Sequence, residues 1–418
     1  MWRVTSKTFG SRIRIRPSVA IGAYFFVNGA TYASWVPRLP QIKVALKVSD
    51  TQLGLTLIGG VVGSLAMSFA FAPAVQRFGS RRMTMVSSMA LTLLLPLIAL
   101  APSAPVLFCA LACLGTVDGF ADVAVNTQGL QLQRQRTKSI VNRLHGTWSV
   151  GALTGGLVAS RSAAVGLSVR TQLIGTSLVL FTVALVAVRW LLPADSPGPA
   201  SAASEADADV ATGGQSFARL GQRASRRAAG IFVLAGAAAV LAEIPATEWS
   251  TLMIVERFHK SGGAAAIGFV GFAAGMVTGR LVGDAVTDTL GANRTRRLGG
   301  TLNALGFLVA CTAPPLVVVI FALSFAGLGS SWLNPLLVRR ASEVFNGPRG
   351  ATLAGVGARM GILFGTPLMG RISDTFSRST ALLIVGGGAA SIMMLLRLPG
   401  DDSEFIASSS PVHADGVA

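Results

Sequence analysis

The stretch VLFCALACLGTVDGFADVAVNTQG (residues 106–129) begins as an apolar run and then carries two acids. A hydrocarbon core about 30 Å thick requires roughly 20 mainly apolar residues per crossing helix, and this stretch has that length. Asp118, Asp122 and Asn126 are spaced i, i+4, i+8, so they share one helix face. An ionised Asp at the centre of a spanning helix costs roughly 2.5 to 3.5 kcal/mol. We therefore expect this face to meet protein or water instead of lipid.

Apolar segments of this length recur along the whole chain. Of its 418 residues, 51% are hydrophobic and 13% charged, outside the balance of ordinary soluble domains. The sequence therefore predicts an all-α membrane protein with twelve transmembrane helices in a lipid bilayer. The expected spans are residues 18–38, 52–75, 83–102, 105–130, 142–161, 171–192, 228–250, 264–287, 297–313, 315–338, 351–371 and 379–398.

A linker between the sixth and seventh spans divides the chain into two halves. It is rich in Ala, Ser, Gly and acidic residues before it turns basic, which is typical of a linker. The first apolar run lacks a small-residue cleavage site and is long enough to span, so we expect no removable signal peptide. The expected segments are a basic tail (1–17), a six-helix bundle (18–192), the linker (193–227), a second six-helix bundle (228–399) and a polar tail (400–418).

The net charge of +17 indicates topology. With both termini in the cytoplasm, about 24 Lys and Arg residues lie on the cytoplasmic side and about 9 outside, as the positive-inside rule requires. No aromatic residues interleave with the basic runs, so we expect no nucleic-acid partner. The three Cys form no disulfide framework and the three His match no metal spacing, so we expect no metal and no cofactor. We expect a monomer in the cytoplasmic membrane.

Landmarks in the first half recur in the second at nearly one spacing, which predicts two related six-helix bundles. Parallel six-helix repeats around a central site are a recurrent plan of secondary transporters, in which the bundles rock against each other. The matched landmarks are Trp35 with Trp249, 214 residues apart, and, 212 residues apart, FGSRR (78–82) with LGANR (290–294), Gly115 with Gly327 and Asp122 with Asn334.

The loop APAVQRFGSRR (72–82) resembles the signature G-x3-D-R-x-G-R-R between helices two and three of the major facilitator superfamily, although Ala72 and Gln76 replace its Gly and Asp. The segment GRLVGDAVTDTLGANR (279–294) is similar to a second copy. The resemblance implies a latch at a cytoplasmic gate; the alternative is simple positive-inside anchoring. Arg280 and Asp284, at i, i+4, are expected to pair. The gate candidates are Arg77, Gly79, Arg81, Arg82, Arg280, Asp284, Asp288, Gly291 and Arg294.

Further stretches look like the fucose-permease branch of that superfamily. They are NGATYASWVPRLP (28–40), VNRLHGTWSVGALTGG (141–156) and TEWSTLMIVERF (247–258). Asp122 and Asn126 match the branch's acid-x-x-x-Asn pattern in helix four, whereas its helix-one Asp is replaced by Val36. The resemblance implies a sugar-like solute.

Polar residues within other spans complete the candidate site. Aromatic and amide groups in span one suit a polyhydroxylated or flat solute. Glu243 and Glu248 bracket Pro245, which lacks a backbone donor; of these two acids, the deeper Glu243 is the expected coupling residue. In the whole chain, Asp122 is the first choice for binding solute or carrying a proton, with Asp118 in support. Arg359 is expected to neutralise an acid or bind an anionic solute, or else to snorkel outward. The solute and proton candidates are Asp118, Asp122, Asn126, Tyr24, Asn28, Tyr32, Asn142, His145, Trp148, Glu243, Glu248, Trp332, Asn334 and Arg359.

These patterns favour a secondary active transporter that moves a small solute by alternating access with proton symport. A proton-driven efflux antiporter is an alternative, disfavoured because SVGALTGG (149–156) lacks the Gly-Pro pair of drug antiporters. A non-transporting membrane sensor is a remote alternative. An enzyme is not expected, since the sequence contains no phosphate loop, nucleophile elbow or metal cluster.

Overall fold

A computed structural model describes residues 9–135, 140–193, 222–260, 263–345 and 348–399. In these parts every element is helical and none is a strand, and helices cover all twelve expected spans. Eight helical segments are long and apolar enough to cross a membrane. Helices of similar length cover the first, fifth, ninth and eleventh expected spans but are more polar, so the count of twelve crossings stays an expectation.

The N-terminal bundle contains the first ten elements. Ser49 begins one of its short helices with a capping box, in which its hydroxyl and the Gln52 side chain each accept from the other residue's backbone N–H. Its elements are α1 (Phe9–Trp35), η1 (Val36–Arg38), α2 (Leu39–Leu46), α3 (Asp50–Leu57), α4 (Gly59–Phe78), α5 (Ser80–Leu100), α6 (Ala104–Arg134), α7 (Val141–Ala164), α8 (Val169–Ala187) and η2 (Val188–Trp190).

The C-terminal bundle contains two π-helical turns, the first of which begins at Pro245. Proline has no N–H to continue the ladder, and π turns are frequent at functional sites. The elements are α10 (Gln222–Leu241), η3 (Pro245–Trp249), α11 (Ser250–Phe258), α12 (Gly263–Leu290), α13 (Ala292–Thr312), α14 (Leu316–Val344), α15 (Pro348–Thr375), α16 (Arg378–Ala381), η4 (Leu382–Gly387) and α17 (Gly388–Leu395).

Close helix contacts confirm the 212-residue repeat. Gly115 of α6 lies against the carbonyl oxygen of Gly60, and Gly327 of α14 lies against that of Phe272. A Cβ at either glycine would overlap the facing carbonyl, so only glycine allows this approach. The loops repeat as well: Gly79 and Gly291 have φ angles of 83° and 80° at the starts of α5 and α13.

Trp35 and Trp249, which the sequence repeat paired, do not occupy equivalent positions in the two bundles. Gly151 of α7 lies against the Phe26 carbonyl of α1, and Gly357 of α15 lies against the Val233 carbonyl of α10. These contacts repeat at 206 to 207 residues, whereas the two tryptophans are 214 apart. Trp35 ends α1, but Trp249 ends the extra π turn that follows α10.

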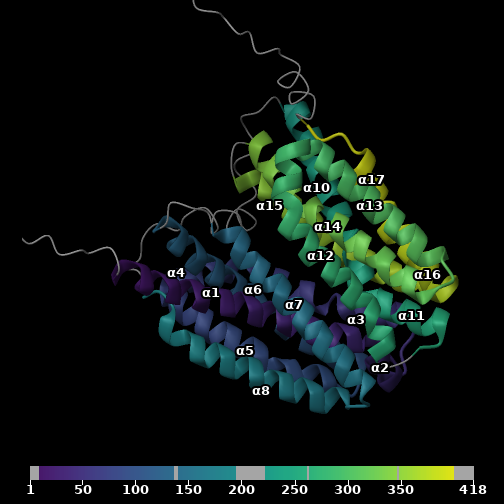
Figure 1. The fold of residues 1–418 in the computed structure, drawn as a ribbon, viewed down its shortest axis with the longest axis horizontal. Coiled ribbons are helices and arrows are strands. Elements are labelled where there is room, and N and C mark those ends of the chain that lie inside the picture. The colour runs from purple at the N-terminus through teal and green to yellow at the C-terminus, as the bar shows by residue number, and fades with distance from the viewer. Residues whose placement is uncertain (1–8, 136–139, 194–221, 261–262, 346–347, 400–418) are drawn as a thin grey trace, which may run out of the picture.

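The two bundles meet at one end and diverge at the other. Figure 1 shows the N-terminal bundle in purple to teal and the C-terminal bundle in green to yellow, joined around α2, α3, α11 and α16. The most extensive contacts between them are α3 with α15 and α7 with α12. The loops at residues 78–82 and 290–294 lie at the diverging end.

Candidate functional site

Tyr32, one turn before the end of α1, lies where the two bundles meet. Its ring stacks on Trp148 of α7, with centroids 6.4 Å apart and planes 29° apart. Its hydroxyl interacts with the Thr247 side chain of η3 in the other bundle, and Glu248, Glu243 and Asp118 act on it electrostatically. Both bundles therefore contribute to this group of side chains.

Arg280 joins this group from α12. Its Nη1 donates to the Ser149 hydroxyl of α7, and its guanidinium carbon lies 5.7 Å from the centroid of the Trp148 ring. It also interacts electrostatically with Glu243. The expected pair of Arg280 with Asp284 was wrong: Asp284 is exposed one turn away, while Arg280 is half-buried and reaches across to the other bundle.

The two acids beside Pro245 have different surroundings. Glu243 is half-buried and close enough to Arg280 for electrostatic attraction. Glu248 is 7% exposed, and its Oε2 has no hydrogen-bond partner among the described residues. The structure therefore makes Glu248, and not the favoured Glu243, the acid that burial isolates from a counter-charge.

The acids of α6 form the single polar face that their spacing predicts. The Asn126 amide donates to the Asp122 carboxylate at 2.8 Å. Asp118 and Asp122 are exposed, and Asp118 interacts electrostatically with both Asp122 and Tyr32. This face is therefore turned towards the space between the bundles. Asn334, the repeat partner of Asp122, is likewise exposed on α14.

His145 lies one turn before Trp148 on α7. It is exposed, its ring packs edge-on against Phe25 at 5.0 Å, and Arg280 acts on it electrostatically. It therefore borders the group around Tyr32. The Asn142 side chain lies outside the described residues.

Other solute candidates pack within their own bundles. Tyr24 is fully buried and donates to the Ala184 carbonyl at 2.8 Å. Asn28 accepts from the Ser88 hydroxyl at 3.4 Å. Each i to i+4 step rotates a helix position by about 40°, so the side chain at residue 24 is turned about 80° from that at residue 32. The shared spacing therefore did not place both tyrosines at the centre.

In the second bundle, Trp332 is also a packing residue. Its indole donates to the Gly279 carbonyl at 2.7 Å, and the side chain is 6% exposed. Arg359 is half-buried on α15, with its guanidinium near Gly355. Glu243 has Arg280, and not Arg359, as its electrostatic partner.

At the diverging end, the gate candidates contact their own bundle. Arg81 donates to the Val188 carbonyl at 3.3 Å, and the Arg77 guanidinium lies over Phe78 at 5.6 Å. Within the described ranges, no ion pair joins these loops across the bundles. Three further candidates are exposed: Arg82, Asp288 and Arg294.

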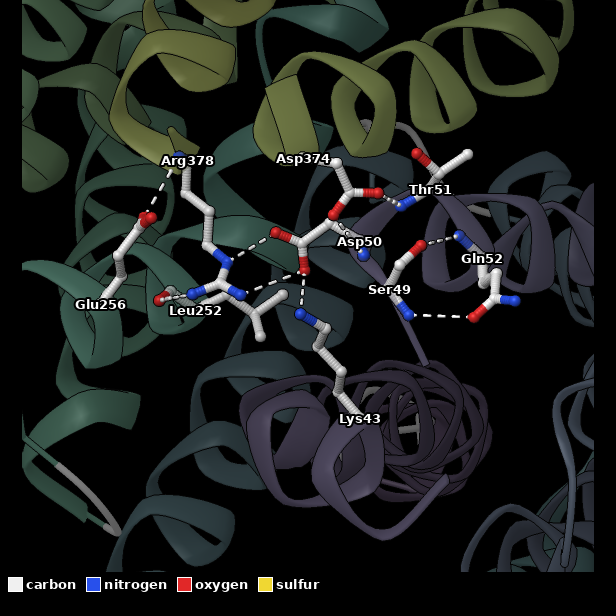
Figure 2. A network of polar contacts seen from close by, with 9 residues as sticks. All are labelled: Lys43, Ser49, Asp50, Thr51, Gln52, Leu252, Glu256, Asp374 and Arg378. Atoms are coloured by element: carbon white, nitrogen blue, oxygen red, sulfur yellow. Dashed lines mark hydrogen bonds and ion pairs between the residues drawn. The ribbon is translucent and has the colours of Figure 1, made fainter. Parts of the chain in front are cut away.

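The joined end contains a charged network that the sequence patterns did not reveal (Figure 2). The Asp50 carboxylate of α3 lies 2.5 Å from Lys43 Nζ and 2.9 Å from Arg378 Nε. The Asp374 carboxylate of α15 accepts from the backbone N–H groups of Asp50 and Thr51. These residues fall outside the expected spans, where charge alone signals only topology.

Comparisons with known proteins agree with this architecture. The family model described as Major Facilitator Superfamily matches residues 21–360. Membrane protein MosC of Rhizobium meliloti is 27% identical over 368 residues, covering 88% of this chain and 86% of that protein. An uncharacterised MFS-type transporter of Yersinia pestis is 26% identical over 376 residues, covering 88% of this chain and 91% of that protein.

Solved structures share the fold. A crystal structure of a variant of the nucleoside transporter NupG aligns with a TM-score of 0.69 and 13% identity, covering 94% of this chain and 100% of that one. The transporter FucP in the outward conformation aligns with a TM-score of 0.59 and 16% identity, covering 91% and 98%.

Proposed function

The chain belongs to the major facilitator superfamily of secondary transporters, and on that premise we propose that it moves a small polar, sugar-like solute across the cytoplasmic membrane by alternating access. The positive-inside asymmetry supports cytoplasmic termini. In that orientation the joined end faces outward and the diverging end faces the cytoplasm, which corresponds to an inward-open state. We expect the transporter to act as a monomer.

One observation carries the proposal: residues of both bundles share the group around Tyr32. The N-terminal bundle contributes Tyr32 and Trp148, and the C-terminal bundle contributes Thr247, Glu248 and Arg280. A site shared by two bundles opens to one side and then the other as they rock. Stacked aromatic rings beside a guanidinium and carboxyl groups suit a ring that carries hydroxyls.

We further propose proton symport, with Glu248 as the coupling residue. An ionised carboxylate in an apolar interior is costly unless it is paired, so a buried acid without a partner favours taking up a proton. Glu248 is in that situation and lies beside the shared site. Proton binding and solute binding at adjacent groups can then be coupled through charge.

Uptake into proteoliposomes under an imposed pH gradient tests the proposal. A panel of sugars, polyols and nucleosides is screened first for a rise in melting temperature and then for accumulation. If no solute moves and none stabilises the protein, the transport proposal is wrong.

Glu248→Gln tests the coupling step. We expect solute exchange to persist while gradient-driven accumulation falls at least about tenfold, because the variant cannot take up a proton at this position. Glu343→Gln, at an exposed pair with Arg339 on α14, is the control and should retain accumulation. Unchanged accumulation in Glu248→Gln would exclude this residue from coupling.

A further inference from the structure

Two contacts of opposite polarity join the bundles between α3 and the α15–α16 corner (Figure 2). The Arg378 guanidinium of the C-terminal bundle donates to both Asp50 carboxylate oxygens, at 2.9 and 3.1 Å. Four residues earlier, the Asp374 carboxylate accepts from the backbone of Asp50 at 2.9 Å and of Thr51 at 2.8 Å. These donors form the N-terminus of α3, where helix donors lack internal partners and anions are favoured.

Each half of this arrangement also has partners within its own bundle. Asp50, whose side chain is 4% exposed, also pairs with Lys43 of α2. Arg378 is held by the Leu252 carbonyl at 3.4 Å through Nη1 and by Glu256 at 3.1 Å through its backbone N–H. A buried charge that loses its partner is strongly destabilising. After separation the Asp50 carboxylate keeps Lys43 and the Arg378 guanidinium keeps the Leu252 carbonyl, so the contact can break without leaving either charge without a hydrogen-bond partner.

The second contact, between α7 and α12, has no such charges at its outer end; Arg280 and Ser149 meet further along the same two helices, in the group around Tyr32. At the outer end, Ser160 of α7 donates to the Gly263 carbonyl of α12 at 3.0 Å, and Gly156 lies against the Phe269 ring. Across this contact, the described residues form no ion pair. At the joined end, charged hydrogen bonds between the bundles are therefore found at the α3–α15 contact and not at the α7–α12 contact.

We propose that Lys43, Asp50, Asp374 and Arg378 form an outer clasp that holds the outer end closed and must break before the transporter opens outward. The inference rests on the proposed alternating-access function. Asp50–Arg378 is the stronger part because it is buried, and Asp374 contributes less because it is exposed. Breaking the clasp raises the population that is open to the outside.

Pulsed EPR distances between spin labels at the outer end test the clasp without any solute. Labels are placed at Val44→Cys of α2 and Val317→Cys of α14, which are 76% and 63% exposed, after replacement of the three native cysteines. Arg378→Gln should raise the ratio of long to short distances about tenfold, the effect of losing charge-assisted hydrogen bonds. Arg339→Gln removes an exposed pair within α14 and should leave the distances unchanged.

A second variant covers the case in which Arg378→Gln does not fold. Asp374→Asn keeps the side-chain shape but loses its charge, so it should shift the same ratio in the same direction by a few-fold. Unchanged distances in every folded clasp variant would overturn the proposal. A distance shift in a protein that transports no solute would leave the clasp standing and refute the transport function, so the two failures are distinguishable.

Discussion

The two contacts at the joined end are copies of each other with different chemistry. In one, Gly370 of α15 lies against Asp50 and Thr51 of α3; in the other, Gly263 of α12 lies against Ala164 of α7. Gly263 follows Thr51 by 212 residues and Gly370 follows Ala164 by 206, the spacings of the structural repeat. Only the first copy carries the clasp. The repeat therefore sets how closely the helices approach, and a few side chains set how strongly each contact is held.

This difference assigns the two contacts different parts in opening. At the outer end of the α7–α12 contact, close packing and a neutral hydrogen bond hold the helices less firmly than charged groups do. Charge-assisted hydrogen bonds are either made or broken. We therefore expect the α3–α15 contact to set the balance between closed and open states, and the α7–α12 contact to guide the movement.

The largest expected effect comes from adding side chains at the two glycines, Gly370 and Gly263, where helices of the two bundles approach each other closely. Gly370→Val and Gly263→Val should each prevent closure of the outer end, since a Cβ would overlap the Asp50 carbonyl oxygen in one case and crowd Ala164 in the other. EPR should show mainly long distances, and solute accumulation should be lost. Closure that persists in only one variant would show that the two contacts are not sterically equivalent.

A smaller effect is expected from the neutral hydrogen bond at the outer end of the α7–α12 contact. Ser160→Ala removes the bond to the Gly263 carbonyl, worth about 1 kcal/mol, and should raise the open-to-closed ratio about fivefold. The distance distribution provides the measurement, with Arg378→Gln as the comparison. A shift as large as that of Arg378→Gln would remove the distinction between the contacts.

The smallest effect concerns pH. Burial raises the pKa of Asp374, but the donors of Thr51 and the backbone N–H of Asp50 lower it more, to about 2. The ordinary Asp pKa is about 3.9, so this contact stabilises the closed state fully above about pH 4 and is lost as pH falls towards 2.

Between pH 5 and 8 the Asp374 contact should therefore not respond. EPR distances recorded across that range in the wild type and in Asp374→Asn check this expectation. A pH shift within the range that disappears in Asp374→Asn would contradict the assigned pKa, and with it the strength of the bonds to α3.

Sequence patterns reached the parts of the site that lie within single helices. The neighbouring pairs Asp118–Asp122 and Asp122–Asn126 are confirmed, because residues four apart lie one turn above each other on a helix. The pattern did not separate Tyr32 from Tyr24, since the direction in which a helix face points depends on its neighbours. The pattern also paired Arg280 with Asp284, one turn away on the same helix. In the folded protein Arg280 instead contacts the Trp148 ring and the Ser149 hydroxyl of α7.

The sequence by itself determined the membrane class, the helical segments and the 212-residue repeat, because apolar length and recurring glycines are properties of the chain read in order. Only the tertiary structure decided which charges meet. Asp50 and Arg378 are 328 residues apart, and nothing local marks them as partners. Their contact depends on how two bundles approach at one end, and that approach is set by the packing of whole helices.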